Sequence, residues 1–275
     1  MRNSHWFIGS LLIVSLSSVL ACGNSGDGTV VTPTTPTPVT TTTSEPTPTP
    51  SPTPTPTPTP TPIPDPTPTT APSIYAQFGN GVQVTMAATT VTLRTTDVPD
   101  HPSPYFGVGH ALYEAPGADM RLNPHSIAAQ NIVLRVPLAP AVGTPSDTPL
   151  GPIGIAVNGV VFFNQYAAGR QPLTGEIQSF DRFNGHPAPS NQYHYHVEPR
   201  WLTASSKSRF LGVLLDGFPV YGTQDANGAT PADLDVCHGH VGATSEFPNG
   251  LYHYHVTDAS PYISGCFRGT PGSVG

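Results

Sequence analysis

Two copies of one short motif carry the residues in this sequence that are best suited to chemistry. The motif is Tyr-His-Tyr-His, found at Tyr193–His196 and again at Tyr252–His255. Side chains alternate between the two faces of an extended strand, so each copy predicts two imidazoles on one face and two phenols on the other. Neutral imidazoles are common ligands of zinc and copper. The pattern therefore predicts a transition-metal site, with the tyrosine rings packed behind it.

The motif ends a longer duplicated unit that adds a third histidine to each copy. In both copies an Asp-x-x-x-Gly-His loop precedes the motif, and its glycine suits a tight turn that brings the histidine back to the strand. The six predicted metal ligands are His186, His194, His196, His240, His253 and His255. Three imidazoles with an open position would activate water, whereas four would close a site that stores or senses the ion.

Carboxylates near these histidines are candidates for supporting roles. Those that can orient a ligand ring through its second nitrogen are Asp181, Asp216 and Asp235. Glu198 follows the first motif by two residues and would share the histidine face of a continuing strand, so it is the candidate catalytic base. The second copy has Thr257 at that position, which argues against this assignment.

The elements that position these residues are predicted to be short strands joined by long loops. The duplicated unit spans about 151–200 and 209–257, and in each copy a strand, an Asx-Gly turn and a second strand precede the loop and the motif. Strands are indicated by alternating or apolar runs at 81–94, 130–136, 154–163 and 210–221. We therefore expect one mainly β domain over 73–275, built from two pseudo-symmetric halves whose histidines meet at their interface.

Histidines outside the repeat are predicted to matter less. His101 lies in a Pro-Asp-His-Pro loop and is a lesser candidate for the same pocket. No ligand role is predicted for His110, His125 or His238. The main alternative to a metal site is a structural cluster of hydrogen-bonded histidines. In another alternative the tyrosines face outward and stack on sugars, while the histidines lie in the core.

The first 72 residues indicate export and attachment. Residues 1–21 are predicted to be a signal peptide, because the apolar run from Trp6 to Leu20 is shorter than the roughly 18 to 20 residues of a membrane span. The four residues that end at Cys22 resemble a bacterial lipobox, which implies a lipid on Cys22 and an anchor in a membrane of the cell envelope. Residues 22–72 are mostly Thr-Pro repeats and predict a disordered, extended stalk.

The cysteine content and the net charge limit the cellular compartments and the binding partners that fit this chain. With Cys22 lipidated, Cys237 and Cys266 remain in an oxidising compartment and are predicted to form a disulfide. In the alternative, Cys237 is a metal ligand and Cys266 is left as a free thiol. The formal net charge is -7 and no basic stripe is present, which argues against nucleic acid and acidic lipid surfaces as partners.

Several motifs together give the chain a specific resemblance. Besides both Tyr-His-Tyr-His motifs they are Pro99-Asp100-His101-Pro102, Gly154 to Gly159, Gly185-His186-Pro187, Asp216 to Gly222, Leu234-Asp235, Gly239-His240 and Gly265 to Gly269. Over most of 73–275 the chain resembles the YHYH domain family, whose members are mostly exported proteins. A cysteine often stands in that family where this chain has Phe183, so a four-cysteine arrangement is not expected here. The resemblance implies no particular reaction.

These observations lead to three hypotheses about function. The first is an exported, lipid-anchored protein that binds copper or zinc through its duplicated histidines, with copper slightly favoured because the motifs lack thiolates and carboxylates. The second is a metal-dependent hydrolase at the cell surface, which an open coordination position beside a carboxylate would favour. The third is an adhesive or glycan-binding module with a cell-wall partner, which an exposed aromatic platform would favour.

Overall fold

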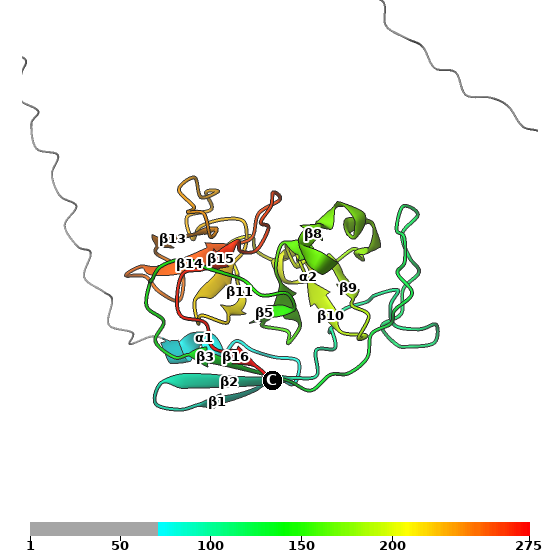
Figure 1. Ribbon diagram of the computed structural model, residues 1–275, viewed down its shortest axis with the longest axis horizontal. Coiled ribbons are helices and arrows are strands. Elements are labelled where there is room, and N and C mark those ends of the chain that lie inside the picture. The colour runs from blue at the N-terminus through cyan, green and yellow to red at the C-terminus, as the bar shows by residue number, and fades with distance from the viewer. Residues whose placement is uncertain (1–70) are drawn as a thin grey trace, which may run out of the picture. The chain divides into compact units, whose positions relative to one another are not determined.

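The computed structural model describes residues 71–275, which form a β-rich unit with few helical turns (Figure 1). Its largest element is an eight-stranded sheet with the order β13-β14-β12-β11-β5-β6-β10-β9. Its strands are β5 (Pro152–Ala156), β6 (Val161–Phe163), β9 (Gly185–Pro187), β10 (Tyr193–Tyr195), β11 (Phe210–Leu214), β12 (Pro219–Tyr221), β13 (Gly239–Gly242) and β14 (Leu251–His255). The predicted mainly β fold is therefore confirmed.

Smaller elements surround this sheet. A four-stranded sheet, ordered β1-β2-β3-β16, contains β1 (Gln83–Met86), β2 (Thr90–Thr95), β3 (Ile132–Pro137) and β16 (Ser273–Val274). Two short pairs are formed by β4 (Ser146–Asp147) with β15 (Cys266–Phe267) and by β7 (Tyr166–Ala167) with β8 (Gln171–Pro172). The helical turns are α1 (Ala71–Tyr75), α2 (Arg200–Thr203), η1 (Ala168–Arg170), η2 (Leu173–Gly175) and η3 (Ile177–Ser179).

The register at the centre of the large sheet shows the internal duplication. β5 and β11 pair antiparallel, with Val213 opposite Ile155 and Leu214 opposite Gly154. Residues 154–156 correspond to 212–214 in the repeat, so a two-fold rotation about the Val213–Ile155 pair maps each strand onto the other. The sheet continues as β6-β10-β9 on one side and as β12-β14-β13 on the other. The two predicted pseudo-symmetric halves are therefore confirmed.

Each half starts with a tight hairpin at its Asx-Gly turn. Gly159 follows β5 with a φ of +84°, and Gly217 follows β11 with a φ of +85°. Their amides donate hydrogen bonds of 2.9 Å to the Ala156 carbonyl and 3.0 Å to the Leu214 carbonyl, respectively. Glycine adopts this left-handed conformation without steric cost, which explains why the predicted turns form there.

The strands that carry the histidine motifs lie far apart. β10 pairs in parallel with β6, and β14 pairs in parallel with β12, so both lie on the outer side of their hairpins. Four strands separate β10 from β14, and Figure 1 shows them toward opposite ends of the sheet. Five strand spacings correspond to about 24 Å. The prediction that the histidines meet at the interface of the halves is therefore wrong, because the central β5–β11 pair forms that interface.

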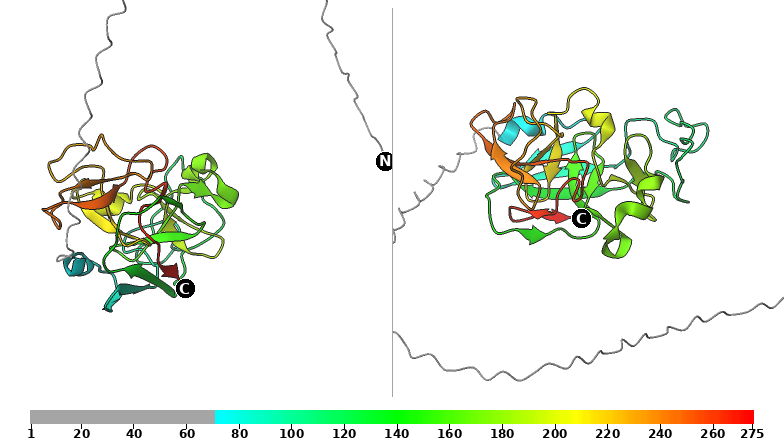
Figure 2. Two further views of the ribbon diagram at one scale, coloured as in Figure 1. Left: turned by 60° about the vertical axis from the view of Figure 1, so that its left-hand side comes forward. Right: turned by 90° about the horizontal axis from the view of Figure 1, so that it is seen from above.

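One hydrophobic core joins the two larger sheets. It includes Val91 and Leu134 from the four-stranded sheet and Ile155 and Val213 from the large sheet. In Figure 1 and in the left view of Figure 2 the four-stranded sheet lies below the large one. The Asp97 carboxylate, in the chain after β2, accepts a 2.9 Å hydrogen bond from the Val161 amide at the start of β6. The smaller sheet thus supports the hairpin that holds the first motif strand.

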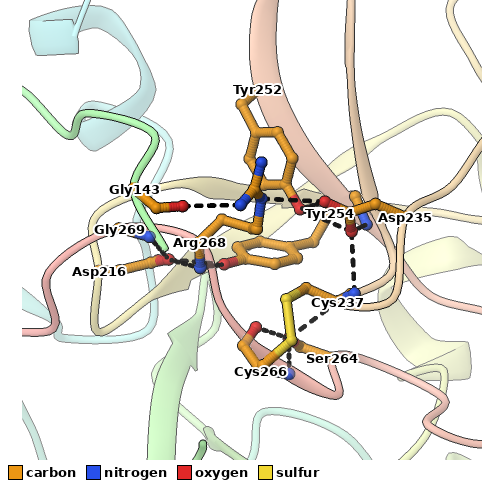
Figure 3. Close-up of a disulfide and its surroundings, with 11 residues drawn as sticks. Gly143, Asp216, Asp235, Cys237, Tyr252, Tyr254, Ser264, Cys266, Arg268 and Gly269 are labelled. Carbon is orange, nitrogen blue, oxygen red and sulfur yellow. Dashed lines mark hydrogen bonds and ion pairs between the residues drawn. A yellow bond between two sulfur atoms is a disulfide. The ribbon is translucent and has the colours of Figure 1, made fainter. Parts of the chain in front are cut away.

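Cys237 and Cys266 form a disulfide, as predicted (Figure 3). The bond joins the Asp-x-x-x-Gly-His loop of the second half to β15 in the C-terminal segment. The Cys237 amide also donates a 2.9 Å hydrogen bond to Asp235 Oδ1. The alternative role of Cys237 as a metal ligand is thereby excluded, because its sulfur is bonded to another sulfur.

Removal of this disulfide should lower stability without changing the fold. The two cysteines are 29 residues apart in the chain, and the loss of such a crosslink costs about 2 to 4 kcal/mol through the greater freedom of the unfolded state. We expect Cys237→Ala/Cys266→Ala to reduce the free energy of unfolding by this amount in urea titrations. Dithiothreitol should shift the midpoint of the unmodified protein but not that of the variant. An unchanged midpoint in the variant would contradict the prediction.

The predictions for the N-terminal region lie outside the described residues. They comprise the signal peptide at 1–21, lipidation of Cys22 and nearly all of the stalk at 22–72. Within 71–275, no helix has both the length and the apolar character needed to cross a bilayer. Helix α1 starts at Ala71, two residues before the predicted domain boundary at 73.

Candidate metal centres

The six predicted histidines gather in two clusters, one in each half of the large sheet. The first cluster consists of His186, His194 and His196, and the second of Asp225, His240, His253 and His255. Within each cluster, one possible ligand atom per residue lies within 4.8 Å of all the others. The first histidine of each cluster comes from an edge strand, β9 or β13, and the other two come from the motif beside it. These groups can hold a metal ion.

The loop before each edge strand is an Asx turn closed by its aspartate. Asp181 Oδ1 accepts hydrogen bonds from the amides of Phe183, at 2.9 Å, and Gly185, at 3.3 Å. In the second half Asp235 Oδ1 accepts the equivalent bonds from Cys237, at 2.9 Å, and Gly239, at 3.2 Å. The duplication is thus preserved down to individual hydrogen bonds. It places both edge strands in the same register, with His186 opposite His194 and His240 opposite His253.

The two loop glycines are required for packing rather than for the turn itself. The left-handed residues are Asn184 and His238, each with a φ of 68°. A Cβ on Gly185 would lie 2.3 Å from the hydroxyl oxygen of Tyr193, and one on Gly239 would lie 2.3 Å from that of Tyr252. The predicted tight-turn role of these glycines is therefore replaced by a close approach of the tyrosine rings. His238 supplies the turn and lies outside the cluster.

The tyrosines lie on the opposite face from the histidines and are buried, as predicted. The exposed fractions are 0% for Tyr193, Tyr195 and Tyr254, and 4% for Tyr252. Because no ring of the motif reaches the surface, the alternative with outward-facing tyrosines as a sugar platform is wrong. The His101 ring also lies on the tyrosine side, where its Nε2 is 2.8 Å from the Tyr195 hydroxyl. His101 is therefore not part of the histidine cluster.

The three predicted supporting aspartates act on tyrosines rather than on histidines. The hydroxyls of Tyr193, Tyr252 and Tyr254 donate hydrogen bonds to Asp181 at 2.7 Å, Asp235 at 3.0 Å and Asp216 at 2.5 Å, respectively. Each carboxylate thereby satisfies a phenol that is buried in the core. The prediction that they orient the histidine rings is wrong, because the histidine face has other hydrogen-bond acceptors.

In the first cluster the Nδ1 atoms of the two motif histidines face backbone carbonyls, which fix their tautomer. His194 Nδ1 donates to the Gln192 carbonyl at 3.1 Å, and His196 Nδ1 donates to the Asn164 carbonyl at 2.6 Å. His186 Nδ1 has neighbours of both kinds: it lies 2.7 Å from the Ser179 hydroxyl oxygen, whose hydrogen is directed at the Glu176 carbonyl, and 3.4 Å from the amide nitrogen of Asn123. A neutral ring that carries its proton on Nδ1 presents a lone pair at Nε2.

The second cluster repeats this arrangement. His253 Nδ1 donates to the Leu251 carbonyl at 2.9 Å, and His255 Nδ1 donates to the Gly222 carbonyl at 2.6 Å. His240 Nδ1 donates to the carboxylate of Asp233 at 2.8 Å. Carbonyl and carboxylate oxygens have no proton to give, so these rings also present their lone pairs at Nε2.

The Nε2 lone pairs of each cluster point toward one common position. The Nε2 atoms of His194 and His196 are 3.0 Å apart, and those of His253 and His255 are 2.9 Å apart. Two nitrogen lone pairs cannot hydrogen-bond each other, so such pairs require a shared proton or a cation between them. His186 Nε2 is buried and has no hydrogen-bond partner at all. The donor set fits a metal ion that prefers imidazole nitrogen.

Burial keeps five of these rings, those of His186, His194, His196, His253 and His255, uncharged at neutral pH. It is the main cause that lowers the pKa of His186 to about 3, with His196 and His125 adding to the shift, and it lowers the pKa of His196 to about 4. Burial also lowers the pKa of His253 to about 4 and moves that of His194 well below the usual range. Neutral imidazole is the form that binds metals, so protons do not compete with an ion near pH 7.

These shifts predict that the metal-free protein loses stability as the pH falls from about 6.5 to 4. In that window the histidines of the unfolded chain, with pKa values near 6.5, become protonated, whereas the buried histidines of the folded clusters stay neutral. Each pKa unit corresponds to about 1.4 kcal/mol per group. Urea midpoints of chelator-treated protein should therefore be lower at pH 5 than at pH 7. The fall should be shallower in His253→Gln/His255→Gln, and equal midpoints at the two pH values in the unmodified protein would contradict the prediction.

Two carboxylates that the sequence did not indicate lie beside the Nε2 atoms. Asp225 Oδ1 is 3.2 Å from His240 Nε2 and 3.3 Å from His255 Nε2. Glu176 Oε2 is 3.8 Å from the Nε2 atoms of both His186 and His196. Both carboxylates lie between the hairpin and the edge strand of their half, but at positions that do not match in the repeat. Alignment of the two copies could not reveal them for this reason.

Glu198, the predicted catalytic base, lies away from the cluster. Strand β10 ends at Tyr195, so the alternation of faces does not continue to Glu198. Its carboxylate accepts a 2.5 Å hydrogen bond from the Thr203 hydroxyl in α2 and forms an ion pair with Lys207. Glu198 therefore links α2 to the segment that follows the first Tyr-His-Tyr-His motif.

A cavity of about 540 Å³ opens beside the first cluster, whose three histidines form part of its wall. Apolar side chains such as Phe163 and Leu150 line it, together with the charged groups of Arg121 and Glu176. His125, for which no role was predicted, also lines the cavity. The segment around β7, β8 and the 3-10 turns forms one side of this space. This volume is typical of sites for small molecules.

The fold and its clusters define a β protein with a duplicated unit and one candidate metal centre in each half. The family model described as YHYH protein matches residues 133–231 and 223–269, which together span both halves. The chain belongs to the YHYH protein family. No curated protein and no solved structure gave a match.

Proposed function

We propose that this protein binds two transition-metal ions, copper or zinc, one at each histidine cluster, for metal binding or handling at the cell envelope. The observation that carries the proposal is the shared tautomer of five of the six rings, together with the unpaired Nε2 of His186. The Nδ1 atoms of these five rings donate to carbonyl or carboxylate oxygens, and their Nε2 lone pairs point into the clusters. A transition-metal cation is the ligand that a group of converging imidazole lone pairs binds best.

A purely structural histidine cluster explains these contacts less well. Hydrogen-bonded histidines in a core are expected to pair one donor with one acceptor, because an unpaired buried polar group costs about 1 to 3 kcal/mol. Here the His194 and His196 lone pairs face each other at 3.0 Å, and His186 Nε2 has no partner. Bound metal would satisfy all three nitrogens at once, which supports metal binding over a structural role.

The place of action is proposed from the N-terminal sequence. The apolar run before Cys22, the lipobox-like residues and the Thr-Pro stalk support export, lipid attachment and a domain held away from a membrane. The disulfide supports an oxidising compartment. Both clusters would then meet metal ions outside the cytoplasm.

Elemental analysis of the purified exported chain tests the proposal. We expect about two equivalents of copper or zinc per chain, and about one in either His194→Ala/His196→Ala or His253→Ala/His255→Ala. The four-histidine variant should bind none. A matched control is His110→Ala, because His110 is exposed and lies outside both clusters. The proposal fails if the unmodified chain holds no metal and takes up neither ion when it is added.

A further inference from the structure

The two centres are related by the internal two-fold, yet their carboxylates differ in position. In a tetrahedral site with metal–ligand distances of about 2.0 Å, neighbouring ligand atoms lie about 3.3 Å apart. Asp225 Oδ1 meets this distance to two Nε2 atoms, at 3.2 and 3.3 Å, so the second cluster is a set of four ligands. Glu176 Oε2 lies 3.8 Å from the corresponding two atoms, which is about half an ångström too far.

We propose that the first centre keeps one coordination position open to its cavity and there binds a small organic anion, whereas Asp225 closes the second centre. The inference rests on the proposed metal binding and adds a ligand to one of the two sites. Three imidazoles with a vacant fourth position are the arrangement of sites that accept an external ligand, and four protein ligands are the arrangement of closed sites.

The local chain structure explains why the halves differ. Between its hairpin and edge strand the first half carries β7, β8, η1, η2 and η3, and residues from this segment line the cavity. The corresponding segment of the second half, residues 222–238, contains no helix or strand and supplies Asp225. The same position in the fold is therefore used to build a cavity wall in one half and to supply a ligand in the other.

The walls of the cavity indicate the class of ligand. Phe163, Leu150 and Tyr166 contribute apolar surface for an aliphatic or aromatic body. A metal ion on three neutral imidazoles retains its positive charge, and the positive group of Arg121 offsets the carboxylate of Glu176 in the lining, so the cavity would stay positive overall. Arg121 has no ion pair among residues 71–275. A carboxylate on a mainly apolar body matches both features.

Single-centre proteins loaded with cobalt(II) allow a direct test by visible spectroscopy. His253→Ala/His255→Ala retains only the first centre, and His194→Ala/His196→Ala retains only the second. We expect azide and benzoate to change the cobalt spectrum of the first-centre protein with saturation, and to leave that of the second-centre protein unchanged over the same concentrations. Equal responses of the two proteins, or no response of the first, would overturn the inference. Failure of either protein to take up cobalt would instead count against metal binding itself.

A cavity-filling variant separates the open position from the cavity. Ala168 is exposed and lines the cavity, so Ala168→Trp should narrow it without disturbing the core. In the first-centre protein this substitution should weaken benzoate binding at least tenfold and leave azide binding within about twofold. Unchanged benzoate affinity would show that the organic body does not lie in this cavity and would overturn that part of the inference.

Discussion

Replacement of Asp216 by alanine should lower the free energy of unfolding by about 4 kcal/mol or more, the largest loss that we expect from a single substitution outside the histidine clusters. The Asp216 side chain is fully buried. Its carboxylate accepts hydrogen bonds from the Tyr254 hydroxyl at 2.5 Å, from the amides of Arg268 and Gly269 at 3.0 Å each, and from the Phe218 amide at 3.3 Å. Figure 3 shows three of these contacts around the C-terminal segment.

The size of the effect follows from the groups that would be left without a partner. A buried donor that loses its acceptor costs about 1 to 3 kcal/mol, and a charged acceptor lies at the upper end of this range. Asp216→Ala would leave the Tyr254 hydroxyl and the buried Gly269 amide without their hydrogen-bond acceptor. It would also create a small cavity beside them. Urea unfolding of the variant, compared with the unmodified domain, measures this loss.

The internal repeat supplies a matched control for this experiment. Asn158 occupies the position of Asp216 in the first half, where its amide group donates to Asp100 at 2.9 Å and to the Tyr195 hydroxyl at 3.2 Å. Because these bonds are fewer and the side chain is neutral, Asn158→Ala should cost only about 1 to 2 kcal/mol. Similar losses for the two substitutions would show that the carboxylate does not organise the C-terminal segment.

The second large effect concerns metal affinity. Asp225→Ala, made in the His194→Ala/His196→Ala background, should weaken metal binding at the second centre by about 100-fold. In the proposed centre Asp225 would supply the fourth ligand atom, since its Oδ1 lies 3.2 and 3.3 Å from two histidine nitrogens, and its loss would leave only three neutral imidazoles as ligands. Competition with a chromophoric chelator at pH 7 measures the affinity.

Glu176 provides the contrast at the first centre. Glu176→Ala in the His253→Ala/His255→Ala background should change metal affinity by less than about threefold, because the carboxylate lies 3.8 Å from the nearest ligand nitrogens. Burial raises the pKa of this carboxyl, which further weakens it as a ligand. If both substitutions reduced affinity equally, the two centres would have the same coordination, and the distinction between an open and a closed site would be lost.

The division of the motif into two faces could be predicted from the sequence because it depends only on local geometry. Alternation along a strand places His194 and Tyr195 on opposite sides, and burial of both is consistent with the fold. The duplicated Asp-x-x-x-Gly-His loop likewise identified His186 and His240 as companions of the motif histidines. Each candidate histidine ligand was found because its position repeats.

Features that depend on strand order or on unmatched loops could not be predicted in this way. The repeat does not reveal whether the two motif strands pair with each other or lie at opposite ends, and the central β5–β11 pair decides this. Glu198 was misplaced because strand alternation was extended beyond the end of β10. Asp225 and Glu176 come from loops that differ between the halves, so only their distances to the histidines reveal them.

Anomalous diffraction from crystals of the metal-loaded protein, at the absorption edge of the bound ion, tests the central claim most directly. We predict two peaks per chain, one among the Nε2 atoms of His186, His194 and His196 and one beside Asp225. They should lie about 20 to 25 Å apart, as expected for five strand spacings across the sheet. A single peak between β5 and β11, or no peak at either cluster, would contradict the presence of two separate metal centres.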